Sequence, residues 1–216
     1  RLRMSREERI AELESVRSRI ATDLHDDIGA SLTQIAVLSE VAQTQARNGK
    51  FYEEPLTKIS DVSNELVGTM SDIVWSINPA KDHLSDLTQR MRRFAADILA
   101  ARSIRFHFAG SDTANETVIG SNLRREIFLI FKESINNVVK HSNAKNVRAT
   151  LVVADGRLRL SIEDDGSGFE TAGDNNRTGN GLKSMERRSR EMGGELSISS
   201  KLGGPTIVVA EFPVES

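Results

Sequence analysis

Apolar side chains recur at seven-residue intervals between residues 56 and 98. Two such registers run side by side, so the segment is predicted to be helical with one continuous apolar seam. A two-helix hairpin cannot bury a seam of this length by itself, whereas two hairpins paired as a dimer would form a four-helix bundle. One register holds Leu56, Met70, Ile77, Leu84, Met91 and Ile98, and the other holds Ile59, Leu66, Ile73, Leu87 and Phe94.

A longer amphipathic pattern precedes this seam. Apolar residues at three- and four-residue steps from Ile10 to Leu38 predict one long helix, which Asn48 and Gly49 end. Pro79 is expected to kink the second helix, because proline removes a backbone donor and crowds the preceding turn. The first part of the chain is therefore predicted to be a two-helix hairpin that forms a dimer.

The pattern changes near residue 103, where glycines become frequent and short alternating strands appear. The fold class predicted is α+β, with a helical hairpin over residues 1–103 and an α/β sandwich with an antiparallel sheet over residues 104–216. The expected strands are 104–108, 147–153, 158–163, 195–199 and 206–212, and the expected helices are 123–141 and 182–192.

Composition excludes several classes of function. The 216 residues include 29 basic and 31 acidic side chains and no cysteine, which argues against direct nucleic-acid binding and excludes thiolate metal sites. No apolar run has the roughly 18 residues of a membrane span. Because the sequence begins with arginine, we expect a piece of a longer protein, in which any membrane anchor would belong to a segment outside this chain. The absence of cysteine favours a reducing compartment, such as the cytoplasm.

Four polar residues share one face of the helix predicted at 123–141. They are Glu133, Asn137, Lys140 and His141. A carboxylate and an amide oxygen one turn apart can hold a hydrated magnesium ion, and a lysine one turn further on can meet a phosphate. Taken alone, such a pattern is more often a solvated polar face.

A second motif, the sequence DDGSGF at residues 164–169, follows a predicted strand. Gly166 and Gly168 allow a tight turn with positive φ and close approach of a ligand to the backbone. Asp164 could accept a hydrogen bond from a donor such as an adenine amino group. Acidic-glycine turns are common, so the motif is weak by itself.

Two further turns are rich in glycine. The first, Gly179-Asn180-Gly181-Leu182, leads into a predicted helix, where backbone N–H groups suit a phosphate. The second precedes Thr206 at the start of the last strand, and this hydroxyl is expected to contact a phosphate. Each turn alone is explained as well by an ordinary loop.

The succession of these four elements is more specific than any of them. Over residues 105–214 it resembles the ATP-binding domain of sensor histidine kinases, the Bergerat-type fold shared with gyrase-type and Hsp90-type ATPases. The resemblance implies ATP and Mg²⁺, with Asn137 as metal ligand and Glu133 polarising water or supporting the ion. Lys140 and His141 would reach phosphates, and Asp164 would bind adenine. The pocket and its mobile lid would involve Gly166, Gly168, Arg177, Gly179, Gly181, Leu182 and Thr206.

The stretch RIATDLHDDIG at residues 19–29 contains a candidate nucleophile, His25. A histidine on a helix is more often structural, but a neutral imidazole can attack a γ-phosphoryl group while Asp26 fixes its tautomer and takes the proton. The stretch resembles the phosphoacceptor helix of the NarL-associated class of histidine kinases. That resemblance implies autophosphorylation of His25 and transfer to an aspartate in the receiver domain of a response regulator.

Two positions depart from the family pattern, and two alternative functions stay open. Ala30 stands where relatives with phosphatase activity carry glutamine, so dephosphorylation of a partner is not expected. Pro205 replaces a glycine and puts the role of Thr206 in question. One alternative is an ATPase of the same superfamily without histidine transfer, and the other is a dimeric scaffold with a degenerate nucleotide pocket.

Overall fold

The computed structural model describes residues 28–48, 52–76, 83–110, 117–170 and 180–214. Two compact units make up the chain, Arg1–Ile77 and Asn78–Ser216. No helix within the described ranges is long and apolar enough to cross a bilayer.

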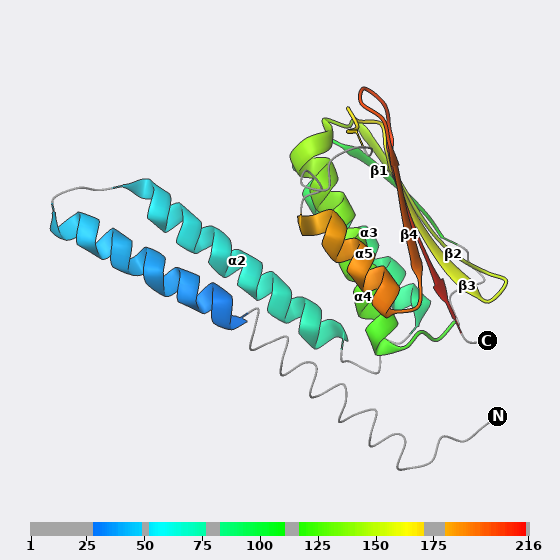
Figure 1. Cartoon of the computed structure of the whole chain (residues 1–216), viewed down its shortest axis with the longest axis horizontal. Coiled ribbons are helices and arrows are strands. Elements are labelled where there is room, and N and C mark those ends of the chain that lie inside the picture. Colours follow the sequence, from blue (N-terminus) through cyan, green and yellow to red (C-terminus); the bar gives the residue numbers. More distant parts are fainter. Residues whose placement is uncertain (1–27, 49–51, 77–82, 111–116, 171–179, 215–216) are drawn as a thin grey trace, which may run out of the picture. The chain divides into compact units, whose positions relative to one another are not determined.

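The first unit contains a helical hairpin, as predicted (Figure 1). One helix covers residues 28–47 and the other, α2, spans Glu53–Ser76. The two heptad registers of α2 differ in burial. Ile73, in one register, is only 4% exposed, whereas Leu56 and Met70, in the other, are 45% and 46% exposed. The hairpin therefore leaves one of its predicted apolar registers uncovered.

The apolar segment beyond α2 does not continue the hairpin. A separate helix, α3, spans Leu84–Ala100 and belongs to the second unit, so the compact units divide after Ile77 and not near residue 103. Its residues Leu87 and Met91 are fully buried, and the helix packs on α4 and β1. A coiled-coil seam and the buried face of a globular helix share the same three- and four-residue spacing, so periodicity could not separate them.

The second unit is built on one five-stranded sheet with the order β1-β2-β3-β5-β4. The sheet is mixed, because β1 pairs with β2 in parallel, whereas the sequence predicted an antiparallel sheet. A parallel pair requires a crossover, which α4 provides between these two strands. The strands are β1 Arg105–Gly110, β2 Asn146–Ala154, β3 Arg157–Asp164, β4 Glu195–Ser200 and β5 Thr206–Pro213.

Three helices, α3, α4 and α5, cover one face of this sheet (Figure 1). The central helix α4, Ser121–Asn137, buries Ile127 and Phe131 completely against the sheet. It continues as a short π-helix, η3, Val138–Ser142, and the last helix, α5, spans Asn180–Glu191. The predicted turn at Asp155-Gly156 is present, with φ of 52° and 71°, both left-handed as a two-residue hairpin turn requires.

Candidate functional site

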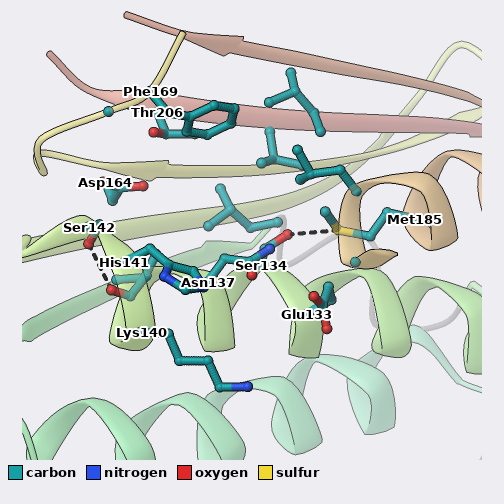
Figure 2. Close-up of a pocket in the computed structure, with 17 residues that line it drawn as sticks. Glu133, Ser134, Asn137, Lys140, His141, Ser142, Asp164, Phe169, Met185 and Thr206 are labelled. Carbon is teal, nitrogen blue, oxygen red and sulfur yellow. Dashed lines mark hydrogen bonds between the residues drawn. The ribbon is translucent and has the colours of Figure 1, made fainter. Parts of the chain in front are cut away.

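A cleft of about 550 Å³ lies in the second unit between the inner face of the sheet and the helices α4, η3 and α5 (Figure 2). It brings together most of the residues that the sequence singled out. These are Glu133, Asn137, Lys140, His141, Asp164, Gly168, Gly181, Leu182 and Thr206. His25, Asp26, Arg177 and Gly179 lie outside the described residues. Gly166 does not line the cleft but lies against Ser142 and Asp164, which do.

The π-helical turn shapes the helical side of the cleft. Regular α-helix ends at Asn137, and Val138–Ser142 follow with the wider hydrogen-bond pattern of a π-helix, closed by Asn143 at φ 54°. Single π-turns are frequent at functional sites. Figure 2 shows His141 and Asn137 at the cleft, whereas Lys140 extends away from Asp164. Glu133 and Asn137 lie one turn apart on regular α4, whereas Lys140 and His141 lie in the π-helical turn and do not continue the same regular face.

Asp164 ends β3 and is 5% exposed. Its Oδ1 accepts a hydrogen bond from the backbone N–H of Gly166 at 2.9 Å, the one partner of its side chain within the described structure. Burial raises the pKa of this carboxyl above its ordinary value, although the bond from Gly166 acts in the opposite direction. A buried carboxylate with acceptor capacity to spare is suited to bind a hydrogen-bond donor on a ligand.

The neighbouring Asp165, in contrast, uses its carboxylate for hydrogen bonds within the protein. Its Oδ1 accepts the backbone N–H groups of Lys145 and Asn146, each at 2.8 Å. The Asn146 side chain donates to the same carboxylate, and these bonds hold its pKa below the ordinary value. Asp165 thus fastens the loop to the start of β2, and only the first aspartate of the motif lines the cleft.

Both glycines of the DDGSGF loop are required by close backbone contacts. A β-carbon on Gly166 would overlap the carbonyl oxygen of Ser142 and lie 2.6 Å from its Cβ. Gly168 has φ +53°, and a β-carbon there would overlap the carbonyl oxygen of Lys201. Because side chains are excluded at both positions, the loop can lie between η3 and the β4–β5 turn.

The opposite end of the cleft is formed by α5 and the middle of α4. Gly181, in the first turn of α5, contacts the carboxylate of Glu133, and Asn137 follows one turn further along α4. Among the described residues no three His, Cys, Asp or Glu side chains form a metal-binding group. A carboxylate and an amide oxygen fit Mg²⁺, which keeps several waters and commonly binds through one or two side chains together with substrate phosphates.

Thr206 lines the cleft at the end where Asp164 lies. It pairs with Asp164 in the β3–β5 ladder, and its hydroxyl is 2.9 Å from that of Ser200. Figure 2 shows it beside Phe169 and Asp164, far along the cleft from Glu133. The Thr206 hydroxyl therefore lies beside Asp164, the residue expected to bind the base, and its expected contact with a phosphate stays a prediction.

Sequence reasoning missed several residues that line or support the cleft. Three of them, Ser142, Phe169 and Ser200, lie in or beside the loops around the cleft, where the backbone N–H of Phe169 donates to Ser200. Ser134 contacts Met185 across the α4–α5 interface, with 3.5 Å between Oγ and Sδ. The sequence did contain a sign of Ser200: every second residue of β4 faces inward, and Ser200 is a polar residue at the last of these inward positions. The apolar floor of the cleft, supplied by Ile162, Ile198 and Val208, was visible only as ordinary strand periodicity.

Comparisons with known proteins give consistent matches. A family model described as "Histidine kinase" matches residues 16–82, and one described as "Histidine kinase-, DNA gyrase B-, and HSP90-like ATPase" matches residues 122–216. The chain is 32% identical over 208 residues to the signal transduction histidine-protein kinase/phosphatase UhpB of Salmonella typhimurium. This alignment covers 93% of this chain and 40% of UhpB. It is 28% identical to the sensor histidine kinase MctS of Rhizobium johnstonii, over 90% of this chain and 42% of MctS.

The fold has solved counterparts as well. The histidine kinase AdeS of Acinetobacter baumannii superposes with a TM-score of 0.61 at 17% identity, over 85% of this chain and 96% of that chain. At this identity the likeness concerns the fold alone. The chain spans less than half the length of the two curated relatives.

Proposed function

This chain belongs to the sensor histidine kinases of two-component signalling, with the segment matched by the "Histidine kinase" model followed by an ATP-binding domain, and on this premise we propose that it phosphorylates its own His25 from Mg-ATP. The phosphoryl group would then pass to an aspartate in the receiver domain of a response regulator. The observation that carries the proposal is one cleft with a buried carboxylate at one end and Glu133 with Asn137 at the other.

Adenine would bind at the sheet end of the cleft. Asp164 accepts a hydrogen bond from the exocyclic amino group, and Thr206 lies beside it in the ladder. Ile162, Ile198 and Val208 supply an apolar surface for the faces of the ring. An apolar pocket with a few polar groups is the usual form of a site for a planar ligand.

The triphosphate would extend towards α5. Gly181 and Leu182 begin this helix, whose N-terminal backbone N–H groups attract anions. Asn137 and Glu133 would hold Mg²⁺, which supplies positive charge to neutralise the phosphates. Lys140 and His141 would add charge or hydrogen bonds. Arg177 and Gly179 are assigned to the lid over the phosphates by family resemblance.

Phosphoryl transfer requires little covalent chemistry from the protein. A ring nitrogen of neutral His25 attacks the γ-phosphorus, the bond from phosphorus to the bridging oxygen breaks, and ADP leaves. Asp26 orients the imidazole and accepts the proton from its other nitrogen. Glu133 supports the metal or polarises a water. Most of the rate acceleration comes from positioning and charge neutralisation.

The proposed assembly is a homodimer formed through the hairpin. Exposed apolar residues on α2, including Val67 and Val74 at 67% and 64% exposure, would be covered by a second hairpin. Direct nucleic-acid binding is not part of the proposal, and the chain would act in the cytoplasm as part of a longer sensor. Ala30 stands where relatives with phosphatase activity carry glutamine, so the proposal is restricted to the kinase and phosphotransfer steps.

The test is incubation with ATP labelled in the γ-phosphate, Mg²⁺, and either the wild type or His25→Gln. We expect acid-labile, alkali-stable label on the wild type that disappears in the variant. His107→Gln, on an exposed residue of β1, is the matched control and should keep the label. Label that persists in His25→Gln would refute the phosphoacceptor assignment, and ATP hydrolysis without any label would favour a plain ATPase.

A further inference from the structure

Ser142 is the last residue of the π-helical turn η3, and its buried hydroxyl makes two hydrogen bonds. It donates to the carbonyl oxygen of Val138 at 2.9 Å, the bond dashed at Ser142 in Figure 2, and it accepts the backbone N–H of Ala144 at 3.0 Å. Both directions are fixed, because a carbonyl oxygen only accepts and a backbone N–H only donates. The donor and the acceptor of this hydroxyl are therefore both in use within the protein.

The two bonds hold the chain where it leaves the helix. A bond from a hydroxyl to the carbonyl four residues earlier also occurs within regular α4, where Ser134 donates to Ile130 at 2.9 Å. The second bond of Ser142 is different, because it spans Asn143, whose left-handed φ of 54° ends the turn. Ala144 is only 6% exposed, so loss of this acceptor would leave a buried N–H group unsatisfied.

The main chain of Ser142 connects η3 to the sheet side of the cleft. Its carbonyl oxygen accepts the backbone N–H of Ser167 at 2.7 Å, and the carbonyl of Ser167 accepts that of Gly203 at 2.7 Å. Gly166 lies so close to Ser142 that a side chain there is excluded. The end of η3 is therefore joined through backbone bonds to the loop that begins with Asp164 and to the β4–β5 turn.

We infer that Ser142 is a positioning residue, whose hydroxyl holds the neighbouring His141 towards the phosphates of the bound nucleotide. Both residues belong to η3 and both line the cleft. Any residue at position 142 would supply the carbonyl that supports the Asp164 loop, whereas only a hydroxyl makes the bonds within the turn. Loss of the hydroxyl should therefore disturb the phosphate end of the cleft and spare the base end.

This inference rests on the proposed function, since His141 contacts phosphates only if ATP occupies the cleft. A merely structural role for Ser142 makes a different prediction, because a loosened helix end would weaken every ligand of the cleft by a similar factor. A positioning role weakens Mg-ATP and leaves adenosine, which has no phosphates, almost unaffected. The ratio of the two affinities therefore separates the two roles.

The experiment measures binding to the 216-residue chain, of Mg-ATP by calorimetry and of adenosine by NMR titration. We expect Ser142→Ala to weaken Mg-ATP by about three- to tenfold, the effect of losing one hydrogen bond, and to leave adenosine nearly unchanged. Ser142→Thr keeps a hydroxyl and should restore the ratio. Should Ser142→Ala fail to fold, Ser142→Cys keeps the volume but donates weakly and should lower the ratio in the same direction.

The matched control is Thr57→Ala. The hydroxyl of Thr57 makes the same bond to the carbonyl four residues earlier, that of Glu53, at 3.1 Å, but it lies exposed on α2 in the first unit. This variant loses one helical hydroxyl bond away from the cleft, so both affinities should keep their wild-type values.

A double-mutant cycle shows whether Ser142 acts through its neighbour. Residues that act through one another have non-additive effects. In a His141→Ala background, Ser142→Ala should therefore cause little further loss of Mg-ATP affinity. Fully additive losses would overturn the inference, and so would a His141→Ala variant that binds Mg-ATP as the wild type does.

The single variants can also overturn it. Equal weakening of Mg-ATP and adenosine in Ser142→Ala would reduce Ser142 to a structural helix end, and unchanged binding of Mg-ATP would show that the hydroxyl does not position the site. Both results leave ATP binding by the wild type, and hence the proposed function, intact. Failure of the wild type to bind Mg-ATP would refute the proposed function together with this inference.

Discussion

The α-carbon of Gly181 lies directly against the carboxylate of Glu133. A β-carbon at position 181 would overlap Oε1 of that carboxylate and lie 2.9 Å from its Cδ. The first turn of α5 and the middle of α4 are therefore in contact at the end of the cleft where the phosphates are proposed to bind.

This contact makes Gly181→Ala a sharp test of the phosphate end. The added methyl group must displace Glu133 or the start of α5, so we expect autophosphorylation to fall at least tenfold, since misplacement of a positioned group by about 1 Å has effects of this size. Gly120→Ala is the matched control, because a β-carbon there meets nothing within 4 Å. Unchanged activity of Gly181→Ala would show that the contact does not constrain the site.

The two adjacent aspartates predict opposite dependences of stability on pH. Burial raises the pKa of Asp164, so its protonated form favours folding at acid pH and this contribution is lost as pH rises through the folded pKa. Without nucleotide, Asp164→Asn should therefore melt at a higher temperature than the wild type at pH 7, and the difference should shrink on acidification. ATP affinity should fall by tenfold or more, because a bond to a charged acceptor is lost.

Asp165→Asn is the control, and its effect on stability should depend on pH in the opposite way. Hydrogen bonds from Asn146 lower the pKa of Asp165, so its stabilising contribution is present at neutral pH and lost as pH falls through the folded pKa. Thermal melts from pH 8 down to below the ordinary aspartate pKa of 3.8 should show this variant destabilised at pH 7 and progressively closer to the wild type at the acid end of the range. Parallel behaviour of the two variants would contradict the assignment of their separate roles.

A partly buried ion pair ties α5 to α4. Nη1 of Arg188 donates to Oε2 of Glu126 at 2.7 Å, and these side chains are 25% and 11% exposed. Glu126→Gln should lower the free energy of unfolding of the second unit by about 1–3 kcal/mol, because a half-buried guanidinium loses its charged partner.

The control for this pair is an ion pair within α5. Glu186 accepts from Arg190 at 2.9 Å, but both side chains are more than 60% exposed. Glu186→Gln should change stability by less than about 0.5 kcal/mol, because solvent screens such pairs. Urea unfolding measures both variants, and equal effects would mean that the α4–α5 bridge contributes no more than a surface pair.

The exposed apolar face of α2, which carries Val67 and Val74, is predicted to be the surface through which two chains form the dimer. Replacing Val67 and Val74 together by Ser should weaken dimerisation at least tenfold, since each side chain would lose about 1–2 kcal/mol of apolar burial. Glu65→Ser, on the far side of the same helix, should leave the dimer unchanged. Sedimentation equilibrium measures the dissociation constants, and an unaltered dimer of the double variant would place the interface elsewhere.

Much of the second unit was predictable because strand alternation and turn chemistry are local. The glycine turn at Asp155-Gly156 and the inward alternation of β3 fix a hairpin without knowledge of the rest of the fold. The order of the glycine motifs likewise predicted which residues meet in one cleft.

Other features depend on contacts that sequence spacing does not encode. The π-turn after Asn137 changes the direction of His141 although the helical pattern continues through it. Thr206 was assigned to the phosphates from its glycine-rich neighbourhood, whereas its position follows from the register of β5 against β3. For Ser200 the decisive information is the hydrogen bond to Phe169, a residue distant in sequence.

The packing of α3 into the second unit decides where this protein can be divided. A fragment that begins at residue 104 would expose the surfaces of α4 and β1 that Leu87 and Met91 cover, and exposed apolar surface of this kind leads to aggregation. The exchangeable module for truncation or for chimaeras with other input domains therefore begins at or before His83, the N-cap residue of α3.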